Sequence, residues 1–233
     1  MIGRLRREGQ GPFLAANMKQ SLLLAFVLLV PSLLFAAPER WAKAIDELTQ
    51  NDATQPPEPG GVVFVGSSSI VGWKSLAEDF PGENVIRRGF GGSELEDSVA
   101  YADRIVIPYK PRIVVLYSGD NDLAGGETPE EVLGDFRDFV AKVHDALPDT
   151  RIVFIAMKPS GSRWSLRENY EKANALIQAE CEQRPELLRF VDVWTPMLGE
   201  DGTPRPELFV KDRLHLSRAG YDLWRQLVAP ALR

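Results

Sequence analysis

A carboxylate and an imidazole lie three residues apart near the end of the sequence, in Asp212-Arg213-Leu214-His215. Such a pair can face one site from a single loop, with the acid orienting the base. The only other histidine, His144, lies in a stretch with helical periodicity, where a histidine is usually a surface or boundary residue. We therefore expect His215 to be the general base and Asp212 to orient it.

A hydroxyl group that such a base could activate is found in Gly66-Ser67-Ser68-Ser69-Ile70, directly after a short apolar run. A serine-rich turn of this kind can cap a helix, bind phosphate or present a nucleophile. The lysine of a phosphate-binding P-loop is missing, and Ile70 stands where the Gly-x-Ser-x-Gly turn of α/β-hydrolases needs its second glycine. Helix capping and nucleophilic catalysis remain as alternatives for these serines.

Two further turns follow later apolar runs. In Gly89-Phe90-Gly91-Gly92-Ser93 the glycines let backbone amides approach a bound atom, although the segment can also be a simple flexible turn. Glu94 replaces the third glycine of a dinucleotide-binding fingerprint. Gly119-Asp120-Asn121-Asp122 carries two carboxylates, but no further ligand cluster supports them, so we expect no metal. Gly92 and Asn121 can instead donate hydrogen bonds to an oxyanion.

These turns must be brought together by the elements that precede them. Short apolar runs rich in β-branched residues alternate along the chain with helical patterns, which predicts a parallel sheet covered by helices on both faces. Ligands bind such sheets at the carboxyl ends of the strands, where the four turns would meet. The five predicted strands cover residues 61–65, 85–86, 113–117, 152–156 and 190–193.

Capping residues mark three predicted helix starts. Ser93 with Glu96, and Ser165 with Glu168, fit the capping box, in which a hydroxyl and a carboxylate satisfy free amides of the first turn. Thr128-Pro129 places a cap and a first-turn proline ahead of a long apolar stripe. We expect helices to begin at these three places.

Taken together, the four polar turns resemble the sequence blocks of the SGNH hydrolases, the GDSL-type esterase and lipase superfamily, over about residues 60 to 230. The resemblance implies a flavodoxin-like α/β fold, a three-layer α/β/α sandwich with a five-stranded parallel sheet. It implies that Ser68 is the nucleophile of an acyl-enzyme mechanism, with His215 as base and Asp212 orienting it. The Ser68 backbone amide, Gly92 and the Asn121 side chain would form the oxyanion hole, with no metal or cofactor.

The sequence departs from the family pattern at two places. The usual Gly-Asp-Ser is Gly-Ser-Ser here, so the choice of Ser68 over Ser67 or Ser69 depends on the alignment. Arg87 replaces the asparagine that commonly starts the second block. A hydrogen bond that braces this loop in the family is therefore expected to be absent or replaced.

Aromatic side chains near the blocks are candidates for a substrate pocket, namely Phe90, Trp73 and Trp164. Aromatic residues are also ordinary core material, and we expect at least one of the three to belong to the core. The turn at Asp120 and Leu214 would also shape the pocket. Because members of the family hydrolyse lipid esters, thioesters, aryl esters and carbohydrate acetyl groups, the resemblance does not choose a substrate.

The first 36 residues have the pattern of a secretory signal. Basic residues precede an apolar run over residues 22–35, which ends in small residues and is short for a membrane span. An uncleaved anchor helix is the alternative, and Met18 is an alternative start. We expect residues 1–36 to be a signal peptide, residues 37–60 an N-terminal helix and linker, and residues 61–233 the hydrolase domain.

Composition limits the function further. The 233 residues are 44% hydrophobic and 26% charged, as in an ordinary globular domain, and the net charge of −6 argues against binding to nucleic acid. The lone Cys181 cannot form an intrachain disulfide and should be dispensable. We expect an esterase for small-molecule lipid, aryl or carbohydrate esters, exported to the periplasm or secreted. The alternative is a catalytically impaired module of the same fold that binds lipid or carbohydrate ligands. The oligomeric state stays open.

Overall fold

A computed structural model describes residues 39–233, and the predicted signal peptide lies outside these residues. The described chain forms one sheet of five strands, all parallel, in the order β2-β1-β3-β4-β5. The predicted five-stranded parallel sheet is therefore confirmed. The strands are β1 (Val62–Gly66), β2 (Val85–Gly89), β3 (Ile113–Tyr117), β4 (Arg151–Ile155) and β5 (Leu188–Val191).

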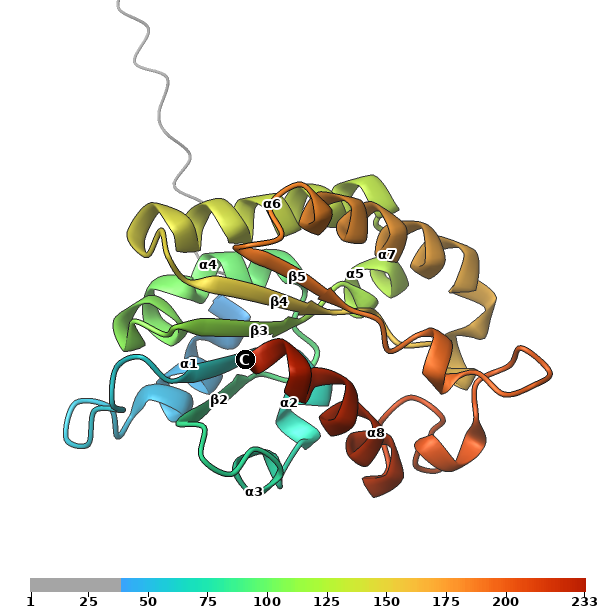
Figure 1. The fold of residues 1–233 in the computed structure, drawn as a ribbon, viewed down its shortest axis with the longest axis horizontal. Helices are drawn as coiled ribbons and strands as arrows, with labels where there is room; N and C mark the ends of the chain where they lie inside the picture. The colour runs from blue at the N-terminus through green and yellow to red at the C-terminus, as the bar shows by residue number, and fades with distance from the viewer. Residues whose placement is uncertain (1–38) are drawn as a thin grey trace, which may run out of the picture. The chain divides into compact units, whose positions relative to one another are not determined.

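Helices cover both faces of this sheet, which confirms the three-layer arrangement (Figure 1). Strand residues alternate between the faces: Val63 and Val65 pack into one core cluster, whereas Val62 and Phe64 pack into the other. On the first face lie α1 (Ala42–Thr49), α4 (Leu95–Ile105), α6 (Pro129–Ala146) and α7 (Arg167–Glu182). On the second face lie α2 (Ser68–Gly72), α3 (Leu76–Asp79) and α8 (Arg218–Val228).

Shorter helices connect the larger elements. The α-helix α5 (Asp120–Gly125) follows β3, and the 3-10 helix η3 (Gly161–Leu166) follows β4. The remaining 3-10 helices are η1 (Glu39–Trp41), η2 (Ile107–Tyr109), η4 (Thr195–Met197), η5 (Pro206–Leu208) and η6 (Ala229–Leu232).

The last strand differs from its predicted position. Residues 190–193 were expected to form it, but β5 pairs with β4 from Leu188 to Val191 and ends there. Val193 is fully buried although it lies beyond the strand. An apolar run in a sequence indicates which residues are buried, not which residues pair with a neighbouring strand. Here the buried part of the chain continues beyond the last paired residue of β5.

One of the three predicted helix caps is confirmed. The hydroxyl of Thr128 accepts a hydrogen bond from the backbone amide of Glu131, whose carboxylate accepts one from the Thr128 amide. The other two predictions are wrong. Helix α4 starts one residue later than predicted, with Glu94 as its cap, and Ser165 lies inside η3, so that α7 starts after it without a side-chain cap.

The residues before β1 contribute to the same compact unit. The predicted N-terminal helix is α1, which packs against α4, and turns connect it to β1. Arg40 forms ion pairs with Glu94 and Asp97 at the start of α4. No helix within residues 39–233 is long and apolar enough to cross a membrane.

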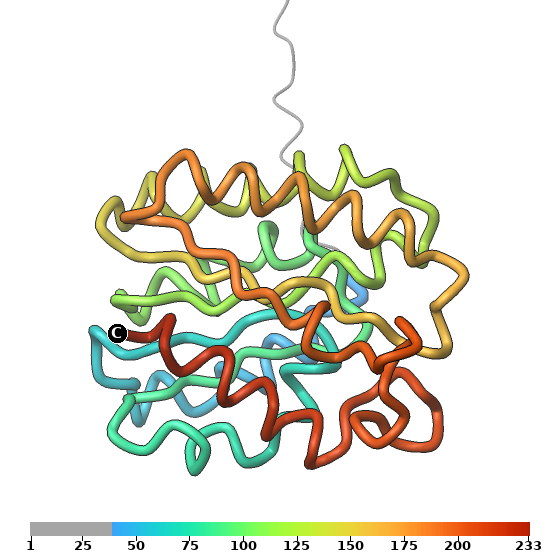
Figure 2. Tube along the Cα trace, turned by 45° about the vertical axis from the view of Figure 1, so that its right-hand side comes forward, coloured from blue at the N-terminus to red at the C-terminus, as the bar shows by residue number. Residues whose placement is uncertain are grey.

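The carboxyl ends of the strands lie on one side of the sheet, as the arrowheads in Figure 1 show. The orange-to-red loop between β5 and α8, which carries Asp212 and His215, lies on the same side in both Figure 1 and Figure 2. The parallel topology therefore brings the ends of distant sequence segments to a common edge.

Candidate active site

Ser68 is the first residue of α2, directly after β1. Its Oγ lies 3.1 Å from Nε2 of His215. The chain can turn here because Gly66 has a φ of +137° and a side chain on it would lie 1.9 Å from the carbonyl oxygen of Tyr117. A glycine is therefore required where β1 passes into the serine turn.

The three consecutive serines have different surroundings. Ser67 and Ser69 are fully buried, whereas Ser68 is half-buried. The Ser67 hydroxyl donates to the carboxylate of Asp120 at 3.5 Å. Only the Ser68 hydroxyl contacts an imidazole, and Ser67 occupies the cap position of α2 without making a side-chain cap bond. Of the three serines, Ser68 is therefore the one whose hydroxyl lies within hydrogen-bond distance of the predicted base, His215.

Asp212 and His215 contact each other within one loop. The Nδ1–H of His215 donates to Oδ2 of Asp212 at 2.7 Å. The other carboxylate oxygen accepts from the backbone amides of Leu214 and His215, both at 2.9 Å. The hydrogen bond from the His215 side chain, with those from the two amides, lowers the pKa of Asp212 to about 2. The carboxylate therefore stays ionised and fixes the imidazole with its Nε2 toward Ser68.

The second histidine lies elsewhere. His144 is on α6, and its Nε2 contacts the carbonyl oxygen of Thr150 at 2.9 Å. His144 therefore contacts the loop before β4 from helix α6, whereas His215 contacts Ser68.

The glycine turn after β2 lies beside the serine. A side chain built on Gly91 would meet Cβ of Ser68 at 3.8 Å, and one on Gly92 would meet the ring of Trp41 at 3.4 Å. Gly92 has a φ of +85°, which favours glycine. The predicted Gly92 thus lies in the turn beside Ser68, next to Gly91, and its role in an oxyanion hole stays a prediction.

Asn121 connects the turns that follow β2 and β3. Its Nδ2 donates to the carbonyl oxygen of Ser93 at 2.8 Å, and its Oδ1 accepts from Nη2 of Arg163 at 2.9 Å. Asp122 strengthens the same connection, because its carboxylate accepts from the amides of Leu95 and Gly119. These tertiary bonds explain why α4 starts after Ser93 and not at it.

Arg87 has a structural role of its own. Its Nη1 donates to the carbonyl oxygen of Trp73 at 3.1 Å and approaches that of Val71 at 3.5 Å. Both carbonyls belong to the carboxyl end of α2, where a cation is favourable for the helix dipole. Instead of the hydrogen bond that the family's asparagine makes in this loop, Arg87 forms hydrogen bonds to the end of α2, the helix that begins with Ser68.

A buried charged network lies behind Asn121. Nζ of Lys158, on the segment after β4, donates to Oδ2 of Asp120 at 3.1 Å and to the hydroxyl of Tyr117 at 2.9 Å. Burial alone would raise the pKa of Asp120, but the positive charges of Lys158 and Arg163 outweigh it and lower this pKa. Burial lowers the pKa of Lys158, opposed by Asp120. Neither cation was predicted, because neither lies within a recognisable motif.

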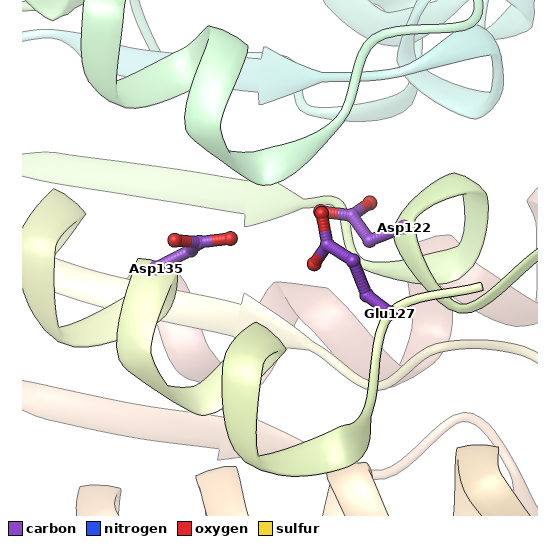
Figure 3. A group of neighbouring side chains, drawn as sticks. All are labelled: Asp122, Glu127 and Asp135. Atoms are coloured by element: carbon purple, nitrogen blue, oxygen red, sulfur yellow. The ribbon is translucent and has the colours of Figure 1, made fainter. Parts of the chain in front are cut away.

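A second group of carboxylates comes from α5, the turn after it and α6. Oxygen atoms of Asp122, Glu127 and Asp135 lie within 4.8 Å of one another (Figure 3). Burial, together with neighbouring carboxylates, raises the pKa of Asp122 to about 8, of Glu127 to about 7 and of Asp135 to about 6. We call these three residues the acidic cluster. Asp120 is not a member, since its carboxylate pairs with Lys158.

The three aromatic pocket candidates fall into different places. Trp73 is fully buried in an aromatic cluster on the second face of the sheet, so its predicted place in the pocket is wrong and it is the expected core member. Phe90 is 2% exposed and lies in the core of the first face, edge-on to Trp41 at 5.6 Å, so its predicted place in the pocket is wrong for the same reason. Trp164 is half-buried and stacks on Trp194 at 6.0 Å. Of the three, Trp164 alone has a partly exposed side chain. The rings around Trp73 are Phe64, Phe80, Tyr221 and Trp224.

A family model agrees with this arrangement. The model of the GDSL-like lipase/acylhydrolase family matches residues 46–223, about three quarters of the chain. No curated protein matches the sequence significantly.

Solved structures share the fold. A Streptococcus pneumonia protein provisionally described as a platelet activating factor has 22% identity and a TM-score of 0.71, over 84% of this chain and 96% of its own. A GDSL-like lipase from Bacteroides thetaiotaomicron has 24% identity and a TM-score of 0.65, over 85% and 98%. An acetylxylan esterase from Geobacillus stearothermophilus has 18% identity and a TM-score of 0.59, over 74% and 94%.

Proposed function

The chain belongs to the GDSL-like lipase/acylhydrolase family, and we propose that it is an exported serine esterase that cleaves carboxylic esters through Ser68, His215 and Asp212. The family and its esterase neighbours support hydrolysis of esters. The serine mechanism, the export and the substrate are the parts that we add.

One observation carries the proposal: the continuous path from Asp212 Oδ2 to His215 Nδ1 at 2.7 Å and from His215 Nε2 to Ser68 Oγ at 3.1 Å. Because Nδ1–H donates to the carboxylate, Nε2 carries the free lone pair and can accept the serine proton. Both distances are within hydrogen-bond reach, which is the geometric requirement for a general base.

The reaction proceeds in two halves. His215 takes the Ser68 proton while Oγ attacks the ester carbonyl carbon, and the carbonyl oxygen becomes an oxyanion. The carbon–oxygen bond to the alcohol then breaks, and the alcohol leaves with the proton from His215. Water attacks the acyl-serine with His215 again as base, and the acid leaves as Ser68 regains its proton.

The oxyanion is stabilised in this proposal by three donors. They are the backbone amide of Ser68 at the start of α2, the backbone amide of Gly92 in the turn after β2, and one N–H of the Asn121 side chain. Removal of one such donor typically lowers kcat by about 10²–10³.

In the acetylxylan esterase, variants with a serine or a histidine replaced by alanine are described as catalytic mutants, which supports a serine and a histidine as catalytic residues here.

The class of substrate is also part of the proposal. We propose small-molecule lipid, aryl or carbohydrate esters as substrates, with export placing the enzyme among envelope or extracellular esters. No cofactor takes part in the proposed reaction.

The test uses p-nitrophenyl esters from acetate to long acyl chains, together with a fluorophosphonate that labels activated serines. We expect wild-type turnover and labelling, both lost in Ser68→Ala and retained in Ser69→Ala, a neighbouring buried serine without contact to His215. Wild-type protein that folds but is neither labelled nor active would contradict the proposal and favour a binding module of the same fold.

A further inference from the structure

We propose that Arg163 is a positioning residue of the oxyanion hole, which holds the Asn121 side-chain amide in the orientation that leaves one Nδ2–H free for the oxyanion. The inference rests on the proposed esterase function and deepens it. Arg163 lies on η3, 42 residues from Asn121 in sequence, and belongs to none of the four sequence blocks.

The orientation of the amide follows from the chemistry of its two partners. The guanidinium of Arg163 can only donate, so it selects Oδ1 of Asn121, at 2.9 Å. The carbonyl oxygen of Ser93 can only accept, so it selects Nδ2, at 2.8 Å. A flipped amide would lose both bonds and face donor with donor and acceptor with acceptor. One Nδ2–H bonds Ser93, and the second remains for a developing oxyanion.

Arg163 is itself held at two points. Its Nη1 donates to the backbone carbonyl of Asp120 at 2.7 Å and lies 3.5 Å from the Asp120 carboxylate. The two terminal nitrogens of one planar guanidinium thus bond two consecutive residues, Asp120 and Asn121. A lysine has a single nitrogen at this distance and cannot reproduce the fork. The side chain is only 21% exposed, which limits its alternative positions.

The charges around Asp120 support the same role. Lys158, whose side chain is 1% exposed, lies 3.1 Å from the Asp120 carboxylate and neutralises it. Arg163 adds a second positive charge beside this one carboxylate, so that a net positive charge is left, and it acts on the oxygen side of the Asn121 amide. A positive charge there makes the Nδ2–H a stronger donor to an anion.

The experiment is a double-mutant cycle with p-nitrophenyl acetate. We expect Arg163→Met to lower kcat by about 10- to 100-fold, a part of the loss for a missing oxyanion donor, and to change KM by less than about twofold. Arg163→Lys should recover less than about threefold of the loss. In an Asn121→Ala background, Arg163→Met should lower kcat by less than about threefold, because both residues act through one hydrogen bond.

The matched control is Arg137→Met on α6, which removes a guanidinium that also makes two hydrogen bonds, to Glu180, away from the serine. Its kcat should equal that of the wild type. Urea unfolding of each variant checks folding, and Arg163→Gln, which keeps one amide donor, replaces Arg163→Met if the latter does not fold.

Three results would overturn the role of Arg163: an unchanged kcat in Arg163→Met, a change in KM alone, or an equal loss of kcat in the wild-type and Asn121→Ala backgrounds. Each of these leaves the esterase function intact, because wild-type turnover and its loss in Ser68→Ala remain. An inactive wild type would instead reject the proposed function. In that case the side-chain amide NMR signals of Asn121 decide the orientation: they should shift in Arg163→Met and stay in place in Arg137→Met.

Discussion

Glu127→Gln should stabilise the folded protein at about pH 8 and leave its stability nearly unchanged at about pH 4.5. Glu127 belongs to the acidic cluster, and its Oε2 is buried without a hydrogen-bond partner among the described residues. Glutamine has nearly the same shape but no charge. The substitution therefore removes a charge that burial and the neighbouring charges of Asp135 and Glu94 disfavour, wherever Glu127 would be ionised.

The magnitude follows from the pKa of Glu127, which burial and then the charges of Asp135 and Glu94 raise from 4.5 to about 7. The folded state holds this proton more tightly than the unfolded state. The stabilisation is present below about pH 4.5 and is lost as the pH rises through 7. The full shift corresponds to about 3 kcal/mol at 1.36 kcal/mol per pH unit. Because the side chain is partly exposed, solvent screening reduces the expected gain to about 1–2 kcal/mol.

Urea unfolding at the two pH values measures the gain as a difference in the free energy of unfolding, with equal m-values required for the comparison. Glu78→Gln is the matched control, since it removes the same charge from an exposed position on α3. An equal gain at both pH values would refute the reasoning, because ionisation could not then be the cause. Destabilisation of Glu127→Gln at pH 8 would also refute it. If a chelator then destabilised the wild type by a similar amount, a cation bound by the three carboxylates would be the cause.

Four further outcomes are expected. Asp212→Asn should lower kcat by about 10⁴, measured with p-nitrophenyl acetate; since hydrogen bonds from His215 lower the pKa of Asp212 to about 2, the wild-type pH profile of kcat/KM should show no limb from Asp212 above about pH 4. Trp73→Ala should cost about 3–5 kcal/mol of stability in urea unfolding, as for a fully buried core residue. Thr128→Ala should cost about 1 kcal/mol in the same assay through loss of the α6 cap. Cys181→Ala should retain full esterase activity, and iodoacetamide should modify the wild-type thiol only slowly, because burial raises its pKa to about 12.

The sheet could be predicted because its information is local. Buried parallel strands are continuous apolar runs, and from that pattern alone the bounds of β1 were predicted to within one residue and those of β3 correctly. The polar residues near the strand ends were found for a similar reason, since Ser68 and Asn121 lie two and four residues after the ends of strands that the pattern marks. The structure brings Ser68, His215 and Asp212 together, and their catalytic roles remain predictions.

The residues that were missed act across the chain. Arg163 reaches Asn121 from η3, and Lys158 reaches Asp120 from the segment after β4; no spacing in the sequence encodes either contact. The helix start expected at Ser93 failed for the same reason, because Asn121 and Asp122 fasten this segment from the turn after β3. Local propensity describes one segment at a time, whereas these positions are decided by partners that only the fold supplies.

Asp212 and His215 lie on one loop and are hydrogen-bonded to each other. Asp212 holds both the imidazole of His215 and the backbone amide of the same residue, so three of its hydrogen bonds close within four residues of chain. A displacement of the loop between β5 and α8 would carry the pair as one rigid unit and leave its internal geometry intact. Such a motion changes the contacts of the loop with other elements, among them the 3.1 Å separation between His215 Nε2 and Ser68 Oγ and the bond from the Ser162 amide to the Arg213 carbonyl. The hydrogen bond between His215 and Ser68 therefore depends on the position of this loop, whereas the bond between His215 and Asp212 does not.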